Sequence, residues 1–485
     1  MSHRRDRTLP EPPLPANRGV VSRVALEEWL IGGGCLIVDV VSWLFIYGVI
    51  SFLRRDQFLV GPFEFLLVDV IQLTFICQAL FMIGGYDRNT DTRTLTYMAE
   101  HILAIAGAAA LSSLLVYAAA TFDSSMKPSR SAVLVSFAVF LPWSILYRRV
   151  IWKYFFSSVA TRTFLVIGSG ELAARFYEAY RASINAQRLE FVDIDGERIG
   201  QHIAGSESPT IEGNLATKLA SLDERYSGVI LAERVDRIRP ELLEHLVRIQ
   251  FQRTRVYTLE SFYETHWRHM PLDAVDPVWP LQTGAQLARM SPYHYLKRLS
   301  DIVLSLAILV ICSPLIVLIA MALWMKQGRP IVFRQQRVGR DHTPFTAYKF
   351  RTMVEPLSAQ EEGLYTRKDD PRITRTGRLL RKLRLDELPQ LWNVLRGDMS
   401  LIGPRAEWTK CVDLYEKKIP FYHFRHLVKP GITGWAQVNY PYGESEEDAL
   451  EKLKYDLYYI RHYSLKLDAM IILKTIHTML FRKGR

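Results

Sequence analysis

Four long apolar segments near the start of this 485-residue chain constrain its fold more than any other feature. They lie at about 25–53, 63–85, 99–122 and 131–148. A helix of about 20 residues crosses the hydrocarbon core of a bilayer, and each segment is about that long. The sequence therefore predicts a transmembrane bundle of four helices at residues 25–150. The alternative is a set of core helices in a soluble protein.

Three carboxylates interrupt this apolar sequence. Asp39 lies in the first segment, and Glu64 and Asp69 lie in the second. Because a charge is costly in the bilayer core, such groups face neighbouring helices rather than lipid. We therefore expect these side chains to point into the bundle, although an interfacial position is open to Glu64.

Positive charges around the bundle predict its orientation. Residues 1–24 are basic and rich in proline, and they lack a short apolar core with a cleavage site, which is typical of a cytosolic tail rather than a signal peptide. Arg148, Arg149 and Lys153 follow the fourth segment. Since cytosolic loops carry an excess of Lys and Arg, both ends of the bundle are placed in the cytosol. Arg54 and Arg55, in the first outside loop, oppose this assignment.

Residues 162–268 alternate short apolar runs with helical patterns, which predicts a Rossmann-like α/β domain with a mostly parallel sheet. Its first strand runs into a G-x-G-x-x-A turn formed by Gly168, Gly170 and Ala173. Asp193 and Asp195 follow where a ribose-binding acid lies in dinucleotide-binding domains, about 20 residues later. The same turn occurs in domains that bind nothing, because glycine also permits tight turns. Cofactor binding and a structural or regulatory role both remain open.

A linker rich in proline and aromatic residues, 269–295, precedes a fifth apolar segment at 299–325. Ser313 and Pro314 lie at its centre, and proline bends a helix because it removes a backbone donor. Lys297 flanks one end and Lys326 the other, so both ends are predicted to be cytosolic. We expect a re-entrant helix, with side chains such as Ser313 satisfying the backbone at the bend. A kinked spanning helix is the alternative.

The chain carries a formal net charge of +11, which predicts an anionic partner. The excess is concentrated at 334–384, where 13 Lys and Arg face 6 Asp and Glu. Beside a membrane segment, such a cluster attracts lipid head groups and phosphate. No helix-turn-helix or similar module accompanies it, so we expect no nucleic acid partner. The four cysteines are far apart, which argues against a zinc site or a disulfide framework.

Residues 377–397 contain leucines at near-helical spacing with basic residues between them, which predicts an amphipathic helix at the membrane interface. Asp386 and Glu387 fall within it. The surrounding cations are expected to keep the pair ionised, and an ionised aspartate is a competent nucleophile toward phosphorus. Taken alone, such a pair on a helix would instead indicate a solvated surface.

Five motifs stand in order around this pair: 348–353 (YKFRTM), 370–377 (DPRITRTG), 385–390 (LDELPQ), 397–405 (GDMSLIGPR) and 429–439 (KPGITGWAQVN). Together they closely resemble the bacterial polyprenyl-phosphate sugar-1-phosphate transferases, the monotopic phosphoglycosyl transferases. The resemblance covers residues 295–485. The four helices and the α/β domain upstream are similar in layout to the large subgroup of that family, the undecaprenyl-phosphate glucose or galactose phosphotransferases. A mostly α-helical monotopic catalytic domain at 296–485, with a re-entrant helix at 299–325, is implied.

The resemblance further implies a ping-pong reaction on the cytosolic face of the bacterial inner membrane. Asp386 would attack the sugar-bearing phosphate of a UDP-sugar and release UMP, and undecaprenyl phosphate would then accept the sugar-1-phosphate. Glu387 would assist, and both carboxylates would hold Mg²⁺. Exopolysaccharide, capsule or O-antigen assembly would begin with this step, and a homodimer is expected. The remaining assigned residues are the phosphate-binding Arg381, Arg405, Lys349, Arg351 and Pro404 and the helix-break pair Ser313 and Pro314.

One stretch departs from the family pattern. After 437–439 (QVN) many relatives continue with Gly-Arg, whereas this chain continues with residues 440–443 (YPYG), so the sugar is not identified. Two other functions remain open. An NAD-dependent sugar-modifying enzyme would use residues 162–268, but no convincing catalytic Tyr/Lys set accompanies the turn. A non-catalytic membrane scaffold for polysaccharide synthesis would tolerate Asp386→Asn.

Overall fold

The computed structural model of the chain describes residues 23–480, apart from 56–62, 88–89, 91, 93, 120, 122–129, 157–162, 184–186, 221–225, 235–236, 253, 273–291, 355–369, 371, 442 and 444. The predicted N-terminal tail and most of the predicted linker lie outside the described residues. The chain divides into two compact units, Met1–Trp267 and Arg268–Arg485. Each unit is described by itself below.

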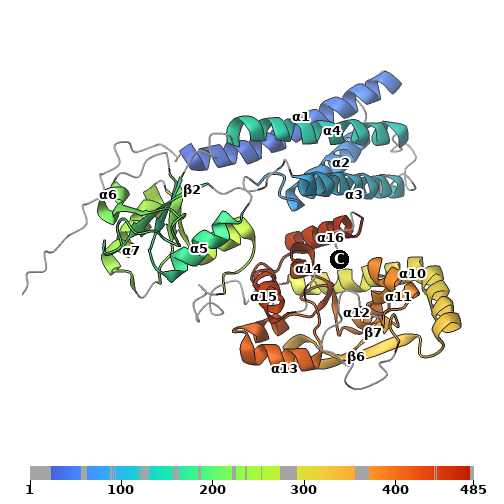
Figure 1. Cartoon of the computed structure of the whole chain (residues 1–485). Coiled ribbons are helices and arrows are strands. Elements are labelled where there is room, and N and C mark those ends of the chain that lie inside the picture. Colours follow the sequence, from blue (N-terminus) through green and yellow to red (C-terminus); the bar gives the residue numbers. More distant parts are fainter. Residues whose placement is uncertain are drawn as a thin grey trace, which may run out of the picture. The chain divides into compact units, whose positions relative to one another are not determined.

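Four helices open the first unit: α1 (Arg23–Arg55), α2 (Phe63–Met82), α3 (Leu95–Ala119) and α4 (Arg130–Phe156) (Figure 1). Three stretches within them, Gly32–Leu53, Tyr97–Leu115 and Ser131–Lys153, are long and apolar enough to cross a membrane. In α2 the apolar part among the described residues is Val70–Met82, which is shorter. Large apolar side chains such as Leu114 point outward, 70% exposed, as lipid-facing residues do.

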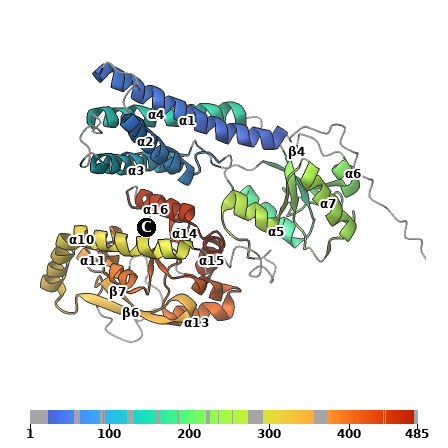
Figure 2. The same ribbon diagram turned by 180° about the vertical axis from the view of Figure 1, so that it is seen from behind.

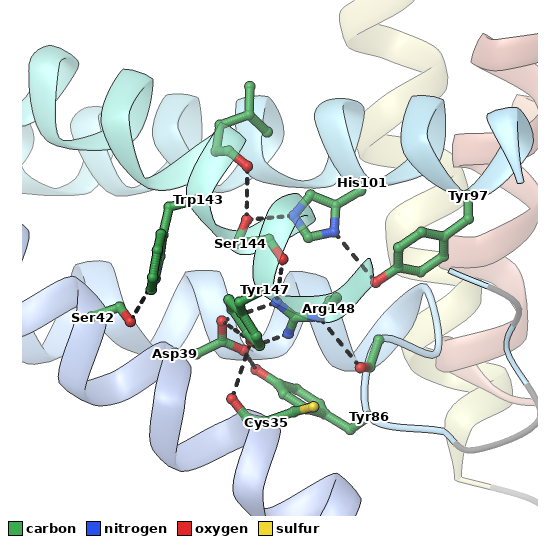
Figure 3. A network of polar contacts seen from close by, with 12 residues as sticks. Cys35, Asp39, Ser42, Tyr86, Tyr97, His101, Trp143, Ser144, Tyr147 and Arg148 are labelled. Atoms are coloured by element: carbon green, nitrogen blue, oxygen red, sulfur yellow. Dashed lines mark hydrogen bonds and ion pairs between the residues drawn. The ribbon is translucent and has the colours of Figure 1, made fainter. Parts of the chain in front are cut away.

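A buried ion pair joins α1 to α4 (Figure 3). The guanidinium of Arg148 donates to both carboxylate oxygens of Asp39, at 3.0 and 2.5 Å. The hydroxyls of Tyr147 and Tyr86 donate to the same carboxylate at 2.6 and 2.8 Å. The expectation that Asp39 faces other helices is confirmed. Arg148, one of the three basic residues that predicted a cytosolic end, is buried inside the bundle and pairs with Asp39. The orientation of the bundle stays a prediction.

The α/β domain contains a five-stranded parallel sheet in the order β3-β2-β1-β4-β5. The central strands are buried apolar runs, as expected where both faces of a parallel sheet are covered. The predicted parallel sheet is thus confirmed. The strands are β1 (Thr163–Ile167), β2 (Arg188–Asp193), β3 (Ile211–Asn214), β4 (Tyr226–Leu231) and β5 (Val256–Thr258), and the helices are α5 (Glu171–Arg181), α6 (Leu215–Ala220), α7 (Pro240–Gln252), α8 (Leu259–Phe262) and η3 (Tyr263–Trp267).

The second unit is mostly helical, with one antiparallel hairpin and one short parallel strand pair. Its main apolar core gathers side chains from helices near the C-terminus, including Leu453, Leu457 and Ile471. The elements are α10 (Tyr293–Gln327), β6 (Val332–Val338), η5 (Arg340–His342), β7 (Pro344–Phe350), α11 (Arg375–Lys382), η7 (Leu385–Glu387), α12 (Gln390–Arg396), β8 (Ser400–Ile402), α13 (Thr409–Lys418), η8 (Tyr422–Leu427), β9 (Gly431–Thr433), α14 (Trp435–Asn439), α15 (Glu446–Arg461) and α16 (Leu465–Leu480).

Helix α10 runs without interruption through Ser313 and Pro314, and its ribbon bends sharply in both views (Figures 1 and 2). Proline at position 314 has no N–H to donate to the carbonyl oxygen of Val310, four residues earlier. The hydroxyl of Ser313 donates to that oxygen instead, at 2.8 Å. The side chain thus satisfies the backbone as the sequence predicts, within a bent continuous helix rather than a broken one. The helix is long and apolar enough to enter a membrane.

Candidate active site

Asp386 and Glu387 lie on a short 3₁₀ turn, η7, and not within one amphipathic helix as predicted. Helix α11 ends before Arg384, whose backbone is left-handed with φ +54°, and α12 begins only after Pro389. A left-handed residue cannot continue an α-helix, so the chain turns at Arg384. Both carboxylates are consequently buried, at 8% and 7% exposure.

A glycine packs α11 against the end of β7. An added Cβ at Gly377 would lie 2.1 Å from the carbonyl oxygen of Thr352, so only glycine fits at this contact. Arg381, one turn further along α11, donates from Nε to the hydroxyl of Thr352 at 3.0 Å. The contact brings α11 beside the strand that carries Lys349.

Three further glycines bring Arg405 to the turn. Strands β8 and β9 run parallel, and Cβ atoms at Gly403, Gly431 or Gly434 would each lie within 2.4 Å of a backbone atom of the facing segment. The close approach also lets the amide of Gly431 donate to the carbonyl of Pro404 at 2.8 Å. The following residue, Arg405, reaches Glu387 from this position.

Glu387 is surrounded by cations. Its carboxylate oxygens lie 2.9 Å from Nζ of Lys349, 3.4 Å from Nη1 of Arg405 and 3.8 Å from Nη1 of Arg384. Burial opposes ionisation of Glu387, but these three cations outweigh it and hold its pKa well below its usual range. Burial also lowers the pKa of Lys349 to about 8, against the attraction of Glu387. Glu387 is therefore ionised at neutral pH, as predicted.

Asp386 differs from its neighbour. Its side chain forms no hydrogen bond or ion pair with the part of the chain that the structure describes. Burial and the adjacent charge of Glu387 raise its pKa, with Lys349, Arg381 and Arg405 acting in the opposite direction. The cations therefore act less strongly on the pKa of Asp386 than on that of Glu387. A more basic carboxylate is also a stronger nucleophile.

The structure brings most of the predicted site residues together and adds two. Arg384 and Arg337 were counted only within the basic cluster, yet Arg384 pairs with Glu387 and the half-buried Arg337 helps to lower the pKa of Lys349. Arg351 lies just beyond β7, where its Nε donates to the carbonyl of Met353 at 3.3 Å. The sequence signal for Arg384 was its position directly before the dyad motif.

A second basic pocket in the same unit is lined by His294, Arg298, Asp301 and Lys429. One of its cations, Arg298, is already committed to contacts within the fold. Arg298 donates to the carbonyl oxygens of Val394 and Leu395, at the end of α12, at 2.6 and 2.8 Å. The dyad turn is therefore the better candidate for chemistry.

The glycine turn of the α/β domain has a structural explanation. A Cβ at Gly168 would lie 2.5 Å from the carbonyl oxygen of Ala232, and its φ is +128°. Asp193, the expected ribose ligand, accepts a hydrogen bond from Ser169 at 2.6 Å and one from the amide of Arg198 at 3.1 Å. Because the turn and its acid are committed to internal contacts, these observations favour the structural interpretation over cofactor binding.

Two carboxylates amid several cations form a site that suits a phosphorylated substrate. Arginine and lysine bind phosphate oxygens, and a carboxylate without a partner is available to attack phosphorus. Oxygen ligands are also what Mg²⁺ prefers, so the Asp386–Glu387 pair fits this ion.

Comparison with known proteins places this site in a family. Residues 292–482 match the family model described as bacterial sugar transferase. The chain is 40% identical over 257 residues to UDP-N-acetylgalactosamine-undecaprenyl-phosphate N-acetylgalactosaminephosphotransferase of Aeromonas hydrophila, covering 53% of this chain and 59% of that protein. It is 33% identical over 334 residues to undecaprenyl-phosphate glucose phosphotransferase of Komagataeibacter xylinus, covering 67% and 60%.

A third relative is shorter and almost fully matched. Exopolysaccharide production protein PSS of Rhizobium leguminosarum bv. phaseoli is 38% identical over 192 residues, covering 39% of this chain and 96% of the relative. The chain spans about three fifths of the two longer relatives, at 59% and 60% of their length. The matched region contains the dyad turn and its surrounding cations. The chain therefore belongs to the bacterial sugar transferase family.

Proposed function

We propose that this protein transfers a sugar-1-phosphate from a UDP-sugar to undecaprenyl phosphate. An oxygen of Asp386 attacks the sugar-bearing phosphorus of the diphosphate. The bond from this phosphorus to the oxygen that bridges the two phosphorus atoms breaks, and UMP leaves with the electron pair. A phosphate oxygen of the lipid then attacks the same phosphorus and expels the carboxylate of Asp386. The products are UMP and a diphosphate-linked lipid sugar, and the enzyme is regenerated.

The contrast within the dyad supports this proposal most strongly. Asp386 is held in a buried turn without a partner among the described residues, whereas Glu387 beside it is fixed by three cations. Lys349 and Arg405 would stabilise the charge that develops on the phosphoryl oxygens, as preorganised cations in a buried site do. Asp386 and Glu387 would hold a Mg²⁺ ion, which when bound supplies further neutralisation of phosphoryl charge.

The lipid acceptor requires the site to lie at a membrane surface. Leu379, Leu383 and Trp392, on and beside the helices that flank the dyad turn, are 57%, 47% and 56% exposed. We propose that these side chains enter the interface while α10 enters one leaflet and returns to the cytosolic face of the bacterial inner membrane. The bend of α10 and the carbonyl satisfied by Ser313 support this topology.

The donor sugar is proposed as a class, together with the kind of polysaccharide pathway and the oligomeric state. The names of the relatives include glucose and N-acetylgalactosamine, so a UDP-hexose or its N-acetylated form is the expected donor. The expected pathway is exopolysaccharide, capsule or O-antigen synthesis, and we propose a homodimer. The strand order of the α/β domain is that of the first five strands of a doubly wound sheet, which supports a Rossmann-like domain in a structural or regulatory role.

UMP release by the purified full chain tests the reaction. We expect UMP from at least one donor in a panel of UDP-glucose, UDP-galactose and their N-acetylated forms, with undecaprenyl phosphate as acceptor. Chelation should abolish turnover, and Mg²⁺ alone should restore it. Absence of UMP with every donor would contradict the proposal. NADH formation or retention of a dinucleotide would instead favour the NAD-dependent alternative, and polysaccharide synthesis that survives Asp386→Asn would favour a scaffold.

Topology is tested with a single cysteine placed near residue 485, in a background without the native cysteines. A re-entrant α10 leaves this cysteine in the cytosol, so a membrane-impermeant thiol reagent should not label it in cells stripped of their outer membrane. Ser313→Ala with Pro314→Leu removes the cause of the bend in the 35-residue helix α10, which is long enough to span when straight, and should expose the cysteine to the reagent. Labelling of the parent protein would show that α10 already spans.

A further inference from the structure

His342, Glu416 and His426 lie together on the second unit, away from each other in sequence. They come from the η5 turn, from α13 and from η8. One ligand atom from each residue lies within 4.8 Å of the other two. Oε1 of Glu416 lies 3.4 Å from Nδ1 of His342 and 3.8 Å from Nε2 of His426. Two donors on one tetrahedral zinc ion lie about 3.3 Å apart, so small side-chain movements complete this geometry.

His426 points to a ligand in this cluster. Its side chain is 6% exposed, and its Nε2 is buried with no hydrogen-bond partner among the described residues. A buried ring nitrogen normally has a partner, because an unsatisfied polar atom costs free energy.

The η5 turn holds His342 in place. Asp341 and His342 are both left-handed, with φ of +53° and +58°. The amide of Gly339 donates to the carbonyl of Thr343 at 2.8 Å and closes the turn. Histidine tolerates this backbone better than most residues do. The turn thus directs the imidazole of His342 toward Glu416 on α13.

We propose that His342, Glu416 and His426 form a structural site for a divalent transition metal, and that zinc is the preferred ion. Two imidazoles and one carboxylate suit zinc, leaving the fourth position to water, and they do not suit Mg²⁺, which prefers oxygen ligands. The absence of a cysteine pair argued against zinc at the level of sequence, but this set contains no cysteine. The ion joins the turn of the β6–β7 hairpin to α13 and η8. It thereby secures Arg425, which directly precedes His426 in η8 and donates to the backbone carbonyl of Arg405 at 3.0 Å.

Zinc binding to the untagged full-length protein tests the proposal. After chelation and buffer exchange, we expect one equivalent of Zn²⁺ per chain in a competition titration with a chromophoric chelator, undisturbed by millimolar Mg²⁺. Co²⁺ in place of Zn²⁺ should give the strong visible bands of a tetrahedral site. If the wild-type protein binds no equivalent of Zn²⁺ and shows no tetrahedral Co²⁺ bands, the proposal is wrong.

Matched variants locate the site. His342→Asn keeps a residue that accepts the left-handed backbone, and it should weaken binding at least about tenfold, as should Glu416→Gln. His423→Gln removes an exposed imidazole from the same η8 segment and should leave binding unchanged. Because His342 and Glu416 are at least partly exposed, both variants should fold, which circular dichroism checks. Equal zinc affinity in the wild type and these two variants would contradict the assignment.

Discussion

Two buried carboxylates in this protein are neutralised in opposite ways. Asp39 in the bundle faces one guanidinium and two tyrosine hydroxyls, and neither member of the ion pair is more than 1% exposed. Glu387 faces three cations, and its neighbour Asp386 has no partner of its own among the described residues. The first arrangement is saturated and neutral, as a structural ion pair is. The second has positive charge in excess, which an anionic substrate can use.

The largest expected effect is at Asp386. Asp386→Asn removes the nucleophile with little change of shape, so turnover should fall on the order of 10⁴-fold or more, measured as UMP release. Asp413→Asn alters an exposed aspartate on α13 and serves as the matched control, with activity unchanged. Normal turnover by Asp386→Asn would show that Asp386 is not the nucleophile.

A smaller loss is expected at Lys349. Lys349→Met removes the ammonium group 2.9 Å from Glu387 and leaves that buried carboxylate with fewer cations. We expect kcat to fall roughly 10²–10³-fold, the range for loss of one preorganised donor to transition-state charge. Lys418→Met, at an exposed ion pair, should leave kcat unchanged. Equal kcat values for the two variants would mean that Lys349 acts only on stability.

Substitutions in the Asp39–Arg148 ion pair should lower stability and leave activity unchanged. Arg148→Met leaves the carboxylate of Asp39 buried and unpaired, which should cost about 3–5 kcal/mol of stability. Replacing both partners, Asp39→Leu with Arg148→Met, should recover most of that loss, because no isolated charge remains. Thermal unfolding in detergent measures both, and UMP release per folded molecule should be unchanged. If the double variant is as unstable as Arg148→Met, the ion pair is not the source of the loss.

The smallest expected effect is on the pH profile. Asp386 must be ionised to attack, and since burial and Glu387 raise its pKa, activity should fall on the acid side at a pH above the usual value for aspartate. Lys349 loses its charge as the pH rises through its pKa of about 8, so activity should also fall above that pH. Lys349→Arg should move this alkaline limb to higher pH, because arginine stays protonated. If the alkaline limb stays at the same pH in Lys349→Arg, a group other than Lys349 causes it.

Local sequence predicted the elements better than it predicted the partners of charged residues. The apolar segments and the alternating strands follow from patterns within a single segment, and they occur as expected. The ion pair of Arg148 with Asp39 was not predicted, because the two residues lie 109 positions apart in sequence and no local pattern reveals such a partner. The cluster of His342, Glu416 and His426 was not predicted either, because its residues are distant in sequence and meet only in the fold.

The candidate site was predicted in its residues but not in its backbone. Family motifs identified the dyad and the cations Lys349, Arg381 and Arg405, which the fold brings together. The leucine spacing predicted one helix, whereas the left-handed Arg384 divides it into α11, η7 and α12. That turn is stabilised by tertiary contacts, such as the packing of Gly377 on Thr352, which spacing alone does not encode.

The covalent intermediate gives the most direct test of the functional half of the comparison. The purified protein is incubated with the UDP-sugar that supports turnover, without lipid acceptor, and the peptide containing residue 386 is analysed by mass spectrometry. A sugar-phosphate adduct on Asp386 that is close to stoichiometric, accompanied by one equivalent of UMP, is the expected result. It should be absent in Asp386→Asn and should disappear from the wild type when undecaprenyl phosphate is added. An adduct on another residue, or turnover with UMP release but no adduct, would contradict the assignment of Asp386 as nucleophile.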